Sequence, residues 1–162
     1  MRSIRQASRI KARVSRRPPE LALSIQYGIE GERLPTRPRL RKWVKAALID
    51  DANVTLRLVG TREGRKLNRD YRGRDYATNV LSFPYPEFDP LAGDIVLCAP
   101  VIAKEARAHG KPLEAHYAHL VVHGMLHLQG FDHENRDDAK AMETRETEIV
   151  IGLGYADPYE VR

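Results

Sequence analysis

The segment LEAHYAHLVVHGMLHL, residues 113–128, constrains the fold more than any other stretch of this sequence. Its pattern predicts a long central helix. At about 100° per residue, four histidines of this segment fall within an arc of about 80° on one helix face. The rest of the chain is therefore expected to pack around a helix that carries a row of imidazoles. These histidines are His116, His119, His123 and His127.

The remaining segments show the alternation and the end signals of shorter elements. Strands are predicted over residues 21–27, 53–59, 78–83 and 94–98, and further helices over 37–50, 62–71, 100–109 and 137–153. A Pro- and Gly-rich connection is expected over 84–93. Strands come early and helices late, so we expect an α+β fold. In this single domain, a small four-stranded mixed β-sheet is covered by about five helices.

The first residues of the chain are strongly basic. MRSIRQASRIKARVSRRPP carries seven basic side chains and no acidic one, and Pro18-Pro19 marks a boundary. Because such a stretch cannot bury a core, we predict a basic, flexible extension over residues 1–19 and a folded domain over 20–162. The extension could bind a polyanion such as RNA, be a solvated tail, or be a mitochondrial transit peptide. We favour polyanion binding.

The charge asymmetry continues into the predicted helix at 37–50. Residues 1–45 hold 13 Lys and Arg against three Glu, whereas the rest of the chain holds 14 basic and 19 acidic residues. Pro38 is expected in the first turn of this helix, with Leu40, Trp43 and Ala47 on its buried side. No apolar run approaches the ~18 residues of a membrane span. The single cysteine fits a reducing compartment.

The stretch HGMLHLQGFDH, residues 123–133, has the spacing H-x3-H-x5-H. His123 and His127 lie one helical turn apart, with Cβ atoms ~6 Å from each other, and a metal with bonds of ~2 Å can bridge them. Gly130 can end the helix in a left-handed conformation and bring His133 round as a third ligand. Three protein ligands leave a position for water, so we expect a hydrolytic rather than a structural site.

Three further polar residues accompany this motif. His116 and His119 could be ligands or proton shuttles, or they could orient the site by hydrogen bonds or line its cleft. We favour the second role, because they lie one or two turns back along the helix. Asp132 could accept a hydrogen bond from a ligand imidazole or cap the turn.

Gly124 is the one departure from the metzincin zinc-protease motif H-E-x-x-H-x-x-G-x-x-H. The glutamate of that motif is the general base of the protease, and a glycine cannot replace it. A phosphodiester instead requires a metal and cations that meet the negative charge on its oxygens. The substitution therefore favours phosphodiesters over peptide bonds.

Arginines that could bind a phosphate cluster in NRDYRGRDYATNVLSF, residues 68–83. A guanidinium binds phosphate in a bidentate way, so Arg69, Arg72 and Arg74 are candidate substrate-binding residues. The alternative is an ordinary basic surface loop.

Four stretches together resemble the YbeY family of bacterial endoribonucleases. They are YRGRDYATNVLSFPYP, GDIVLC, GKPLEAHYAHLVVHGMLHLQGFDH and ETEIVIGLGYADPY, within about residues 53–159. The resemblance implies a cytoplasmic, zinc-dependent, single-strand-specific endoribonuclease. Such proteins act in ribosomal RNA maturation, at the 3′ end of 16S rRNA, and in ribosome quality control. The metal-binding histidines of the family match His123, His127 and His133, and its functional arginine matches Arg72. Residues 1–19 lie outside the resemblance.

The expected mechanism places one Zn²⁺ per chain on the three histidines, His123 among them, with a metal-bound water, and Arg72 on the scissile phosphate. The nucleophile could be that water or the ribose 2′-OH. Expected partners are single-stranded RNA, ribosomal RNA, and the small ribosomal subunit or its assembly factors, with no membrane. A mitochondrial location is the less favoured alternative. Two other classes remain open, a metzincin-like peptide hydrolase and a ribosome-associated binding module with a structural zinc.

Overall fold

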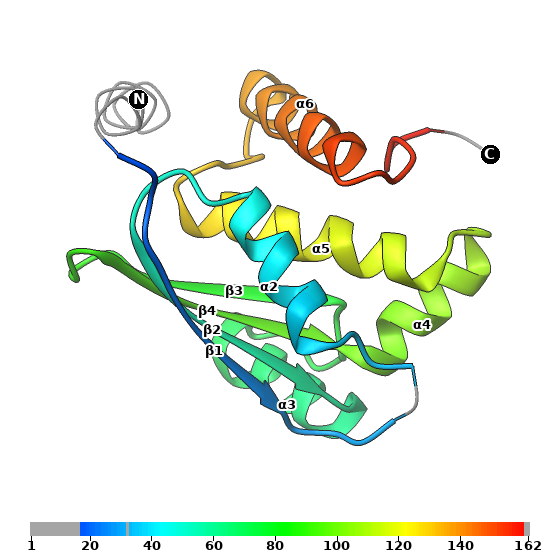
Figure 1. The fold of residues 1–162 in the computed structure, drawn as a ribbon. Helices are drawn as coiled ribbons and strands as arrows, with labels where there is room; N and C mark the ends of the chain where they lie inside the picture. The colour runs from blue at the N-terminus through cyan, green and yellow to red at the C-terminus, as the bar shows by residue number, and fades with distance from the viewer. Residues whose placement is uncertain (1–16, 32, 161–162) are drawn as a thin grey trace.

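The computed structural model describes residues 17–31 and 33–160. Within them, four strands and five helices follow one another in the predicted order, and the predicted α+β fold in a single domain is confirmed. The elements, labelled as in Figure 1, are β1 (Leu21–Tyr27), α2 (Arg37–Ala46), β2 (Ala52–Val59), α3 (Thr61–Arg72), β3 (Val80–Tyr85), β4 (Leu91–Cys98), α4 (Ala99–Ala108), α5 (Leu113–Leu128) and α6 (Arg136–Gly152).

The sheet is mixed, with the strand order β1-β2-β4-β3. β1, β2 and β4 run parallel, and β3 pairs antiparallel with β4. The parallel neighbours are joined through helices, whereas the antiparallel pair needs only a short turn. β1 and β3 are therefore the two edge strands.

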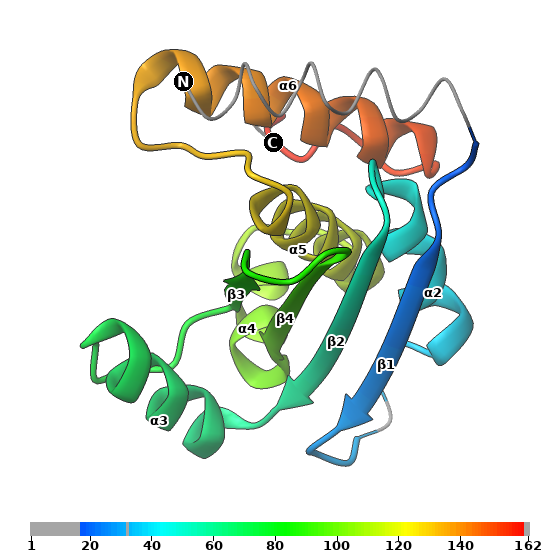
Figure 2. The ribbon, with the colours of Figure 1, turned by 90° about the vertical axis from the view of Figure 1, so that its left-hand side faces the viewer.

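Helices cover both faces of the sheet. α5 and α2 pack on one face, α6 covers α5 from outside, and α3 lies on the opposite face (Figures 1 and 2). Side chains of β4 alternate between the two sides. Ile95 and Leu97 enter the main core beneath α5, whereas Val96 and Cys98 enter a smaller core beneath α3. α5 is thus enclosed on most sides, as expected of a central helix.

α2 is shorter than the sequence suggested. Leu40, Trp43 and Ala47 are buried as predicted, but the helix ends at Ala46 rather than at residue 50. The Ile49 amide donates to the side-chain oxygen of Gln129 at 2.8 Å. This long-range bond replaces the helical one, and a local sequence pattern cannot reveal it.

The connection between β3 and β4 is also shorter than predicted, because β3 extends to Tyr85 and β4 begins at Leu91. Pro84 is tolerated because β3 is an edge strand, where a missing N–H costs little. Gly93 belongs to β4, and a Cβ there would lie 2.7 Å from the Leu128 side chain. The glycine therefore lets the end of α5 approach the sheet closely.

Gly124 makes a second close approach in the middle of α5. A Cβ at this position would lie 3.2 Å from Ile95 Cγ2 and 3.3 Å from Ser82 Oγ. Position 124 therefore faces β3 and β4, and a longer side chain would press into the sheet. In the sequence motif, Gly124 stands where a zinc protease has its general base. In the structure, the close approach of α5 to the sheet explains why a small residue stands there.

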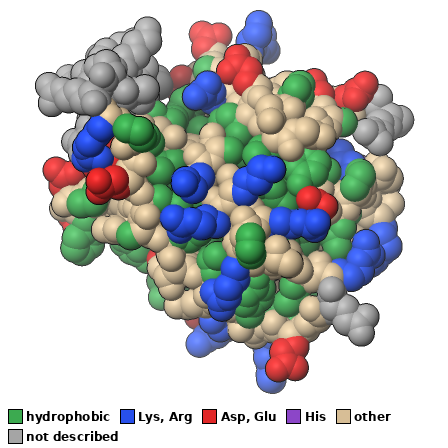
Figure 3. Space-filling view, in the orientation of Figure 1, with side chains coloured by type: hydrophobic (Ala, Val, Ile, Leu, Met, Phe, Trp, Pro, Cys, Tyr) green, Lys and Arg blue, Asp and Glu red, His purple; other side chains and the backbone are tan. Residues whose placement is uncertain are grey.

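Basic side chains gather over α2, as Figure 3 shows. In the described part of the chain, this helix carries much of the positive charge that the sequence places before residue 46. Residues 1–16 of the predicted extension lie outside the described residues, but Arg17 forms an ion pair with Asp51 at 2.6 Å. None of the described helices is long and apolar enough to span a bilayer. The exposed cations of α2 are Arg37, Arg39, Arg41, Lys42 and Lys45.

The contact of α5 with the sheet predicts a large cost for Gly124→Glu. The new carboxylate would meet Ile95 and Ser82, so we expect a loss of about 3 kcal/mol or more in the free energy of unfolding, measured by urea denaturation. Gly152→Glu is the matched control. A Cβ at that position of α6 meets nothing within 4 Å, so its effect should stay within about 0.5 kcal/mol. Equal stability of the two variants would contradict the packing role.

Candidate functional site

The C-terminal end of α5 brings three imidazoles together. The ring centroids of His123 and His127 lie 6.3 Å apart, and His133 lies 5.7 Å from the first and 5.8 Å from the second. Gly130 has a φ of 102°, the left-handed conformation that the sequence predicts, and it turns the chain back towards α5. We call His123, His127 and His133 the histidine trio.

Two members of the trio are held in one tautomer. The Nδ1 of His123 bonds to Glu146, and the Nδ1 of His127 lies 3.0 Å from the carbonyl oxygen of Phe131. Because a carbonyl oxygen can only accept, Nδ1 of His127 carries the proton, and Nε2 keeps a free lone pair. Metal-bound histidines usually show this arrangement, in which the other ring nitrogen is held by a carboxylate or a carbonyl.

The trio fits a metal in donor type and tautomer but is slightly open. A tetrahedral ion with bonds of ~2 Å would hold three imidazole centres about 5 Å apart. The observed separations of 5.7–6.3 Å are wider. Consistent with this, no group of three or more His, Cys, Asp or Glu side chains in residues 17–31 and 33–160 lies close enough together to hold a metal ion. Zinc binding therefore stays a prediction.

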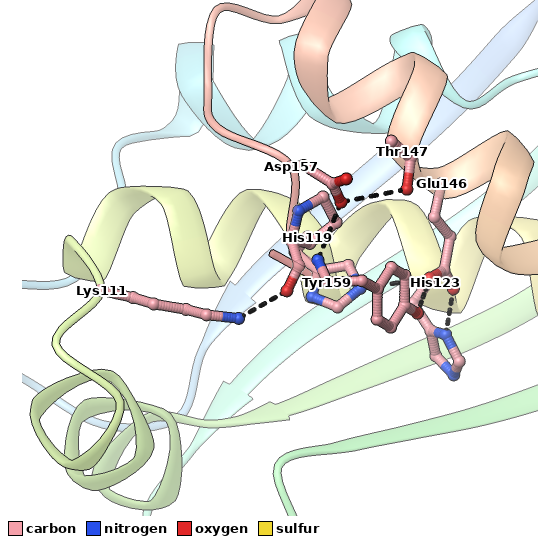
Figure 4. A network of polar contacts seen from close by, with 8 residues as sticks. Lys111, His119, His123, Glu146, Thr147, Asp157 and Tyr159 are labelled. Atoms are coloured by element: carbon pink, nitrogen blue, oxygen red, sulfur yellow. Dashed lines mark hydrogen bonds and ion pairs between the residues drawn. The ribbon is translucent and has the colours of Figure 1, made fainter. Parts of the chain in front are cut away.

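A buried carboxylate that the sequence analysis missed supports this site. Glu146 of α6 is fully buried and accepts hydrogen bonds from His119, His123 and the Tyr159 hydroxyl (Figure 4). Burial by itself raises the pKa of Glu146, but the bonds from the two histidines and the tyrosine outweigh it and hold the pKa at about 2. The pKa of Tyr159 is raised by burial and by its bond to the carboxylate.

The segment after α6 brings Tyr159 to this carboxylate. The Tyr159 amide donates to Asp157 Oδ1 at 2.9 Å, and Thr147 Oγ1 lies 3.4 Å from the same oxygen. Lys111 Nζ donates to the Pro158 carbonyl at 2.7 Å, which ties the segment to the loop before α5 (Figure 4). Two parts of the chain that are distant in sequence, residues 111–123 and 146–159, therefore meet around Glu146.

One sequence signal could have identified Glu146. The buried residues of α6 are Met142, Glu146 and Val150, each one turn apart. A carboxylate inside an otherwise apolar stripe must find partners when the stripe is buried. Its partners cannot be read from that stripe, because they lie on α5 and in the C-terminal segment.

The other predicted polar residues have distinct positions. His116 Nε2 pairs with Glu105 at 2.9 Å, and His119 reaches the trio through Glu146. His119 therefore has the geometry of a residue that orients the site by hydrogen bonds, because it shares Glu146 with His123. Asp132 Oδ1 accepts from the His133 amide at 2.6 Å and from the next amide at 3.0 Å, the geometry of a turn cap.

The three candidate arginines point in different directions. Arg72, the last residue of α3, donates to the Ser82 carbonyl at 2.7 Å, and Ser82 Oγ packs beside Gly124. Arg72 therefore reaches the strand that adjoins the residue after His123. Arg69 lies near two carboxylates, Asp70 at 3.3 Å and Asp75 at 3.9 Å.

The last of the three, Arg74, contacts the Tyr76 hydroxyl at 3.3 Å. Of the predicted substrate-binding residues, Arg72 is thus the one that the fold joins to the trio through Ser82 and Gly124. Arg69 is drawn towards acidic side chains instead.

Comparisons with known proteins point to one family. The pattern of the family described as Endoribonuclease YbeY matches residues 32–154. Proteins of that name from Aromatoleum aromaticum and Methylobacillus flagellatus are 62% and 55% identical to this chain, and the matches cover 86% and 87% of it and 92% and 95% of the relatives. A solution structure from Thermotoga maritima is 28% identical with a TM-score of 0.54, over 85% of this chain and 99% of that one.

The Glu146 network predicts a pH-dependent contribution to stability. The pKa of Glu146 in the fold lies below its ordinary value of 4.5. Its contribution is therefore complete above pH 4.5 and is lost as the pH falls towards about 2. Glu146→Gln should lower the free energy of unfolding at pH 7 by about 2–3 kcal/mol, and this difference from the original protein should shrink as the pH falls through that window.

Urea denaturation of chelator-treated protein across this pH range would measure the difference. Glu143→Gln is the control, because Glu143 is exposed on the same helix. Its difference from the original protein should stay small at every pH. A Glu146→Gln curve parallel to that of the original protein would contradict the network.

Proposed function

The chain belongs to the YbeY family of endoribonucleases, and from this premise we propose that it is a zinc-dependent enzyme that cuts single-stranded RNA at the histidine trio. The observation that carries this proposal is that three imidazoles gather at the end of α5, which packs through Gly124 on the strand whose Ser82 carbonyl accepts a hydrogen bond from Arg72. Imidazoles supply metal ligands, and a guanidinium supplies a phosphate clamp.

His123 and His127 would hold the metal through their Nε2 atoms, and His133 would be the third ligand. When bound there, a divalent ion would lower the pKa of a coordinated water and offset negative charge on the phosphate. Glu146 orients His123, and the Phe131 carbonyl orients His127. Because Glu146 is held ionised, it also offsets the charge of a nearby cation. The trio lies at the surface, with His133 exposed, so a substrate strand could reach it.

Arg72 would bind the scissile phosphate. Its guanidinium has five N–H donors, and the bond to Ser82 uses one of them. The contacts with Ser82 and with the Phe83 ring fix its direction, so the remaining donors are arranged before RNA binds. A preorganised cation is worth most where charge develops in the transition state.

The packing of Gly124 favours this chemistry over peptide hydrolysis. A glutamate at this position, which a metzincin requires as its base, would press against Ile95 and Ser82. The chain therefore has no room for that base in the described arrangement. The basic face of α2 gives sequence-independent attraction for RNA phosphates, in keeping with the charge balance of the first 45 residues.

We further propose a role in ribosomal RNA maturation, at the 3′ end of 16S rRNA, and in ribosome quality control in the cytoplasm. The partners would be ribosomal RNA and the small ribosomal subunit or its assembly factors. Family membership and the basic face of α2 support this role. Cleavage of precursor and mature 16S rRNA by the purified protein, with mapped ends, tests it. A 2′,3′-cyclic phosphate on the products would identify the 2′-OH as the nucleophile.

Arg72→Ala is expected to lower the rate of RNA cleavage by about 10²–10³-fold while the metal content stays unchanged. Arg72→Lys should recover only part of the rate, because an ammonium lacks the planar fork. Cleavage of a labelled single strand and metal analysis of the same samples would measure both. Arg107→Ala, at an exposed position of α4, is the control and should cut normally. Loss of the metal together with activity would instead assign Arg72 to the metal site.

Metal analysis of the purified protein should find about one zinc per chain, and His127→Ala should lose it along with cleavage. His109→Ala, at the exposed end of α4, is the control and should keep both. Removal by a chelator should abolish cleavage, and added Zn²⁺ should restore it. Cleavage that persists without metal would contradict the metal-dependent mechanism. Retained zinc with no cleavage in any assay would point to a binding module.

A further inference from the structure

Exposed aromatic side chains gather beside Arg72. Tyr71, at the end of α3, is 69% exposed, and Tyr85, at the end of β3, is 37% exposed. Tyrosine rings are only intermediate in burial, but exposed rings that gather on one surface often mark a binding site. Their exposure next to the proposed phosphate-binding arginine therefore requires an explanation.

These rings form one connected surface. Tyr71 meets Phe83 edge to face, with ring centroids 5.5 Å apart. Phe83 and Tyr85 lie two residues apart on β3, so their side chains share a face of the sheet. The Arg72 guanidinium lies 5.4 Å from the centroid of the Phe83 ring. We call Tyr71, Phe83 and Tyr85 the aromatic platform.

The platform is held in place by its surroundings. The Tyr85 hydroxyl donates to Asp94 Oδ2 at 2.7 Å, which fixes the ring against β4. Phe83 packs on the small core beneath α3 and supports Tyr71. The exposed rings are therefore not free to fold away from water. Phe83 and Tyr85 lie on β3, an edge strand of the sheet that residues 17–31 and 33–160 form.

We propose that the aromatic platform stacks the bases of single-stranded RNA next to the phosphate held by Arg72. Surfaces that bind single strands combine cationic groups with aromatic rings on which bases stack, whatever the base. Here the cation lies over the Phe83 ring, and Ser82, whose side chain points to the opposite face of β3, packs beside Gly124 of α5. This inference rests on the proposed function.

The platform also gives a physical reason for single-strand specificity. In a duplex, each base is already stacked and paired, so its faces are not available to Tyr71 or Tyr85. A single strand can turn its bases onto the rings while its backbone passes Arg72. The platform thus selects the substrate, and the trio cuts it.

Tyr71→Leu tests the platform, because leucine is a good helix former at this exposed position but offers no ring. The probe is a 2′-O-methyl oligouridylate of about ten nucleotides, compared with the same backbone lacking bases. Tyr71→Leu should weaken binding of the oligouridylate about five- to hundredfold and leave binding of the base-free strand unchanged. Tyr71→Phe, which keeps the ring, should bind as the original protein does. Fluorescence anisotropy would measure all of these.

The outcomes separate the platform from the enzyme. If the original protein cuts RNA but Tyr71→Leu binds the oligouridylate as tightly, the platform is overturned while the proposed function stands, and a protein partner becomes the occupant of this surface. Equal weakening for the strand with and without bases would also overturn stacking, because it would indicate a loss of phosphate contacts. If the original protein neither binds nor cuts any single-stranded RNA, both proposals fail.

Ile151→Ala, an exposed apolar position on α6, is the surface control. It should change neither the affinity for the oligouridylate nor the affinity for the strand without bases.

Discussion

The site depends on one buried carboxylate. Glu146 is enclosed between α6 and α5, where an isolated charge would be costly, and three donors from two other segments compensate it. The same bonds fix the outer helix on the central one, order the C-terminal segment and set the orientation of His123. Fold and site are therefore not separable here, because one group supports both the packing of α6 and the direction of an imidazole.

Much of the fold could be predicted because its signals are local. Alternating residues identify β1 and β2, and the long apolar segment with its four histidines identifies α5 as the central helix. Within the site, the spacing around Gly130 predicts how His133 returns to α5, because a helix ending in a left-handed residue reverses the chain within a few positions. These features need no knowledge of the rest of the molecule.

The parts that could not be predicted depend on contacts between distant segments. α2 ends early because the side chain of Gln129 takes the Ile49 amide. The partners of Glu146 come from α5 and from the segment after α6, and no spacing within α6 names them. The reason for a glycine at position 124 could not be predicted either, because it lies in contacts with the sheet. The motif presents it as a lost base, whereas the sheet beneath it explains why no larger residue stands there.

The hydrogen bond from Arg72 of α3 to β3 has one more consequence. β3 ends the sheet, and a strand with unpaired backbone groups can recruit a strand from another molecule. The Arg72 guanidinium donates to the Ser82 carbonyl on this strand, and a charged side chain lying along an edge discourages such pairing. The residue that we propose to bind the scissile phosphate would therefore also hinder edge-to-edge pairing between copies of the protein. The need to avoid such pairing and the need to bind phosphate would then both restrict which residue can stand at position 72.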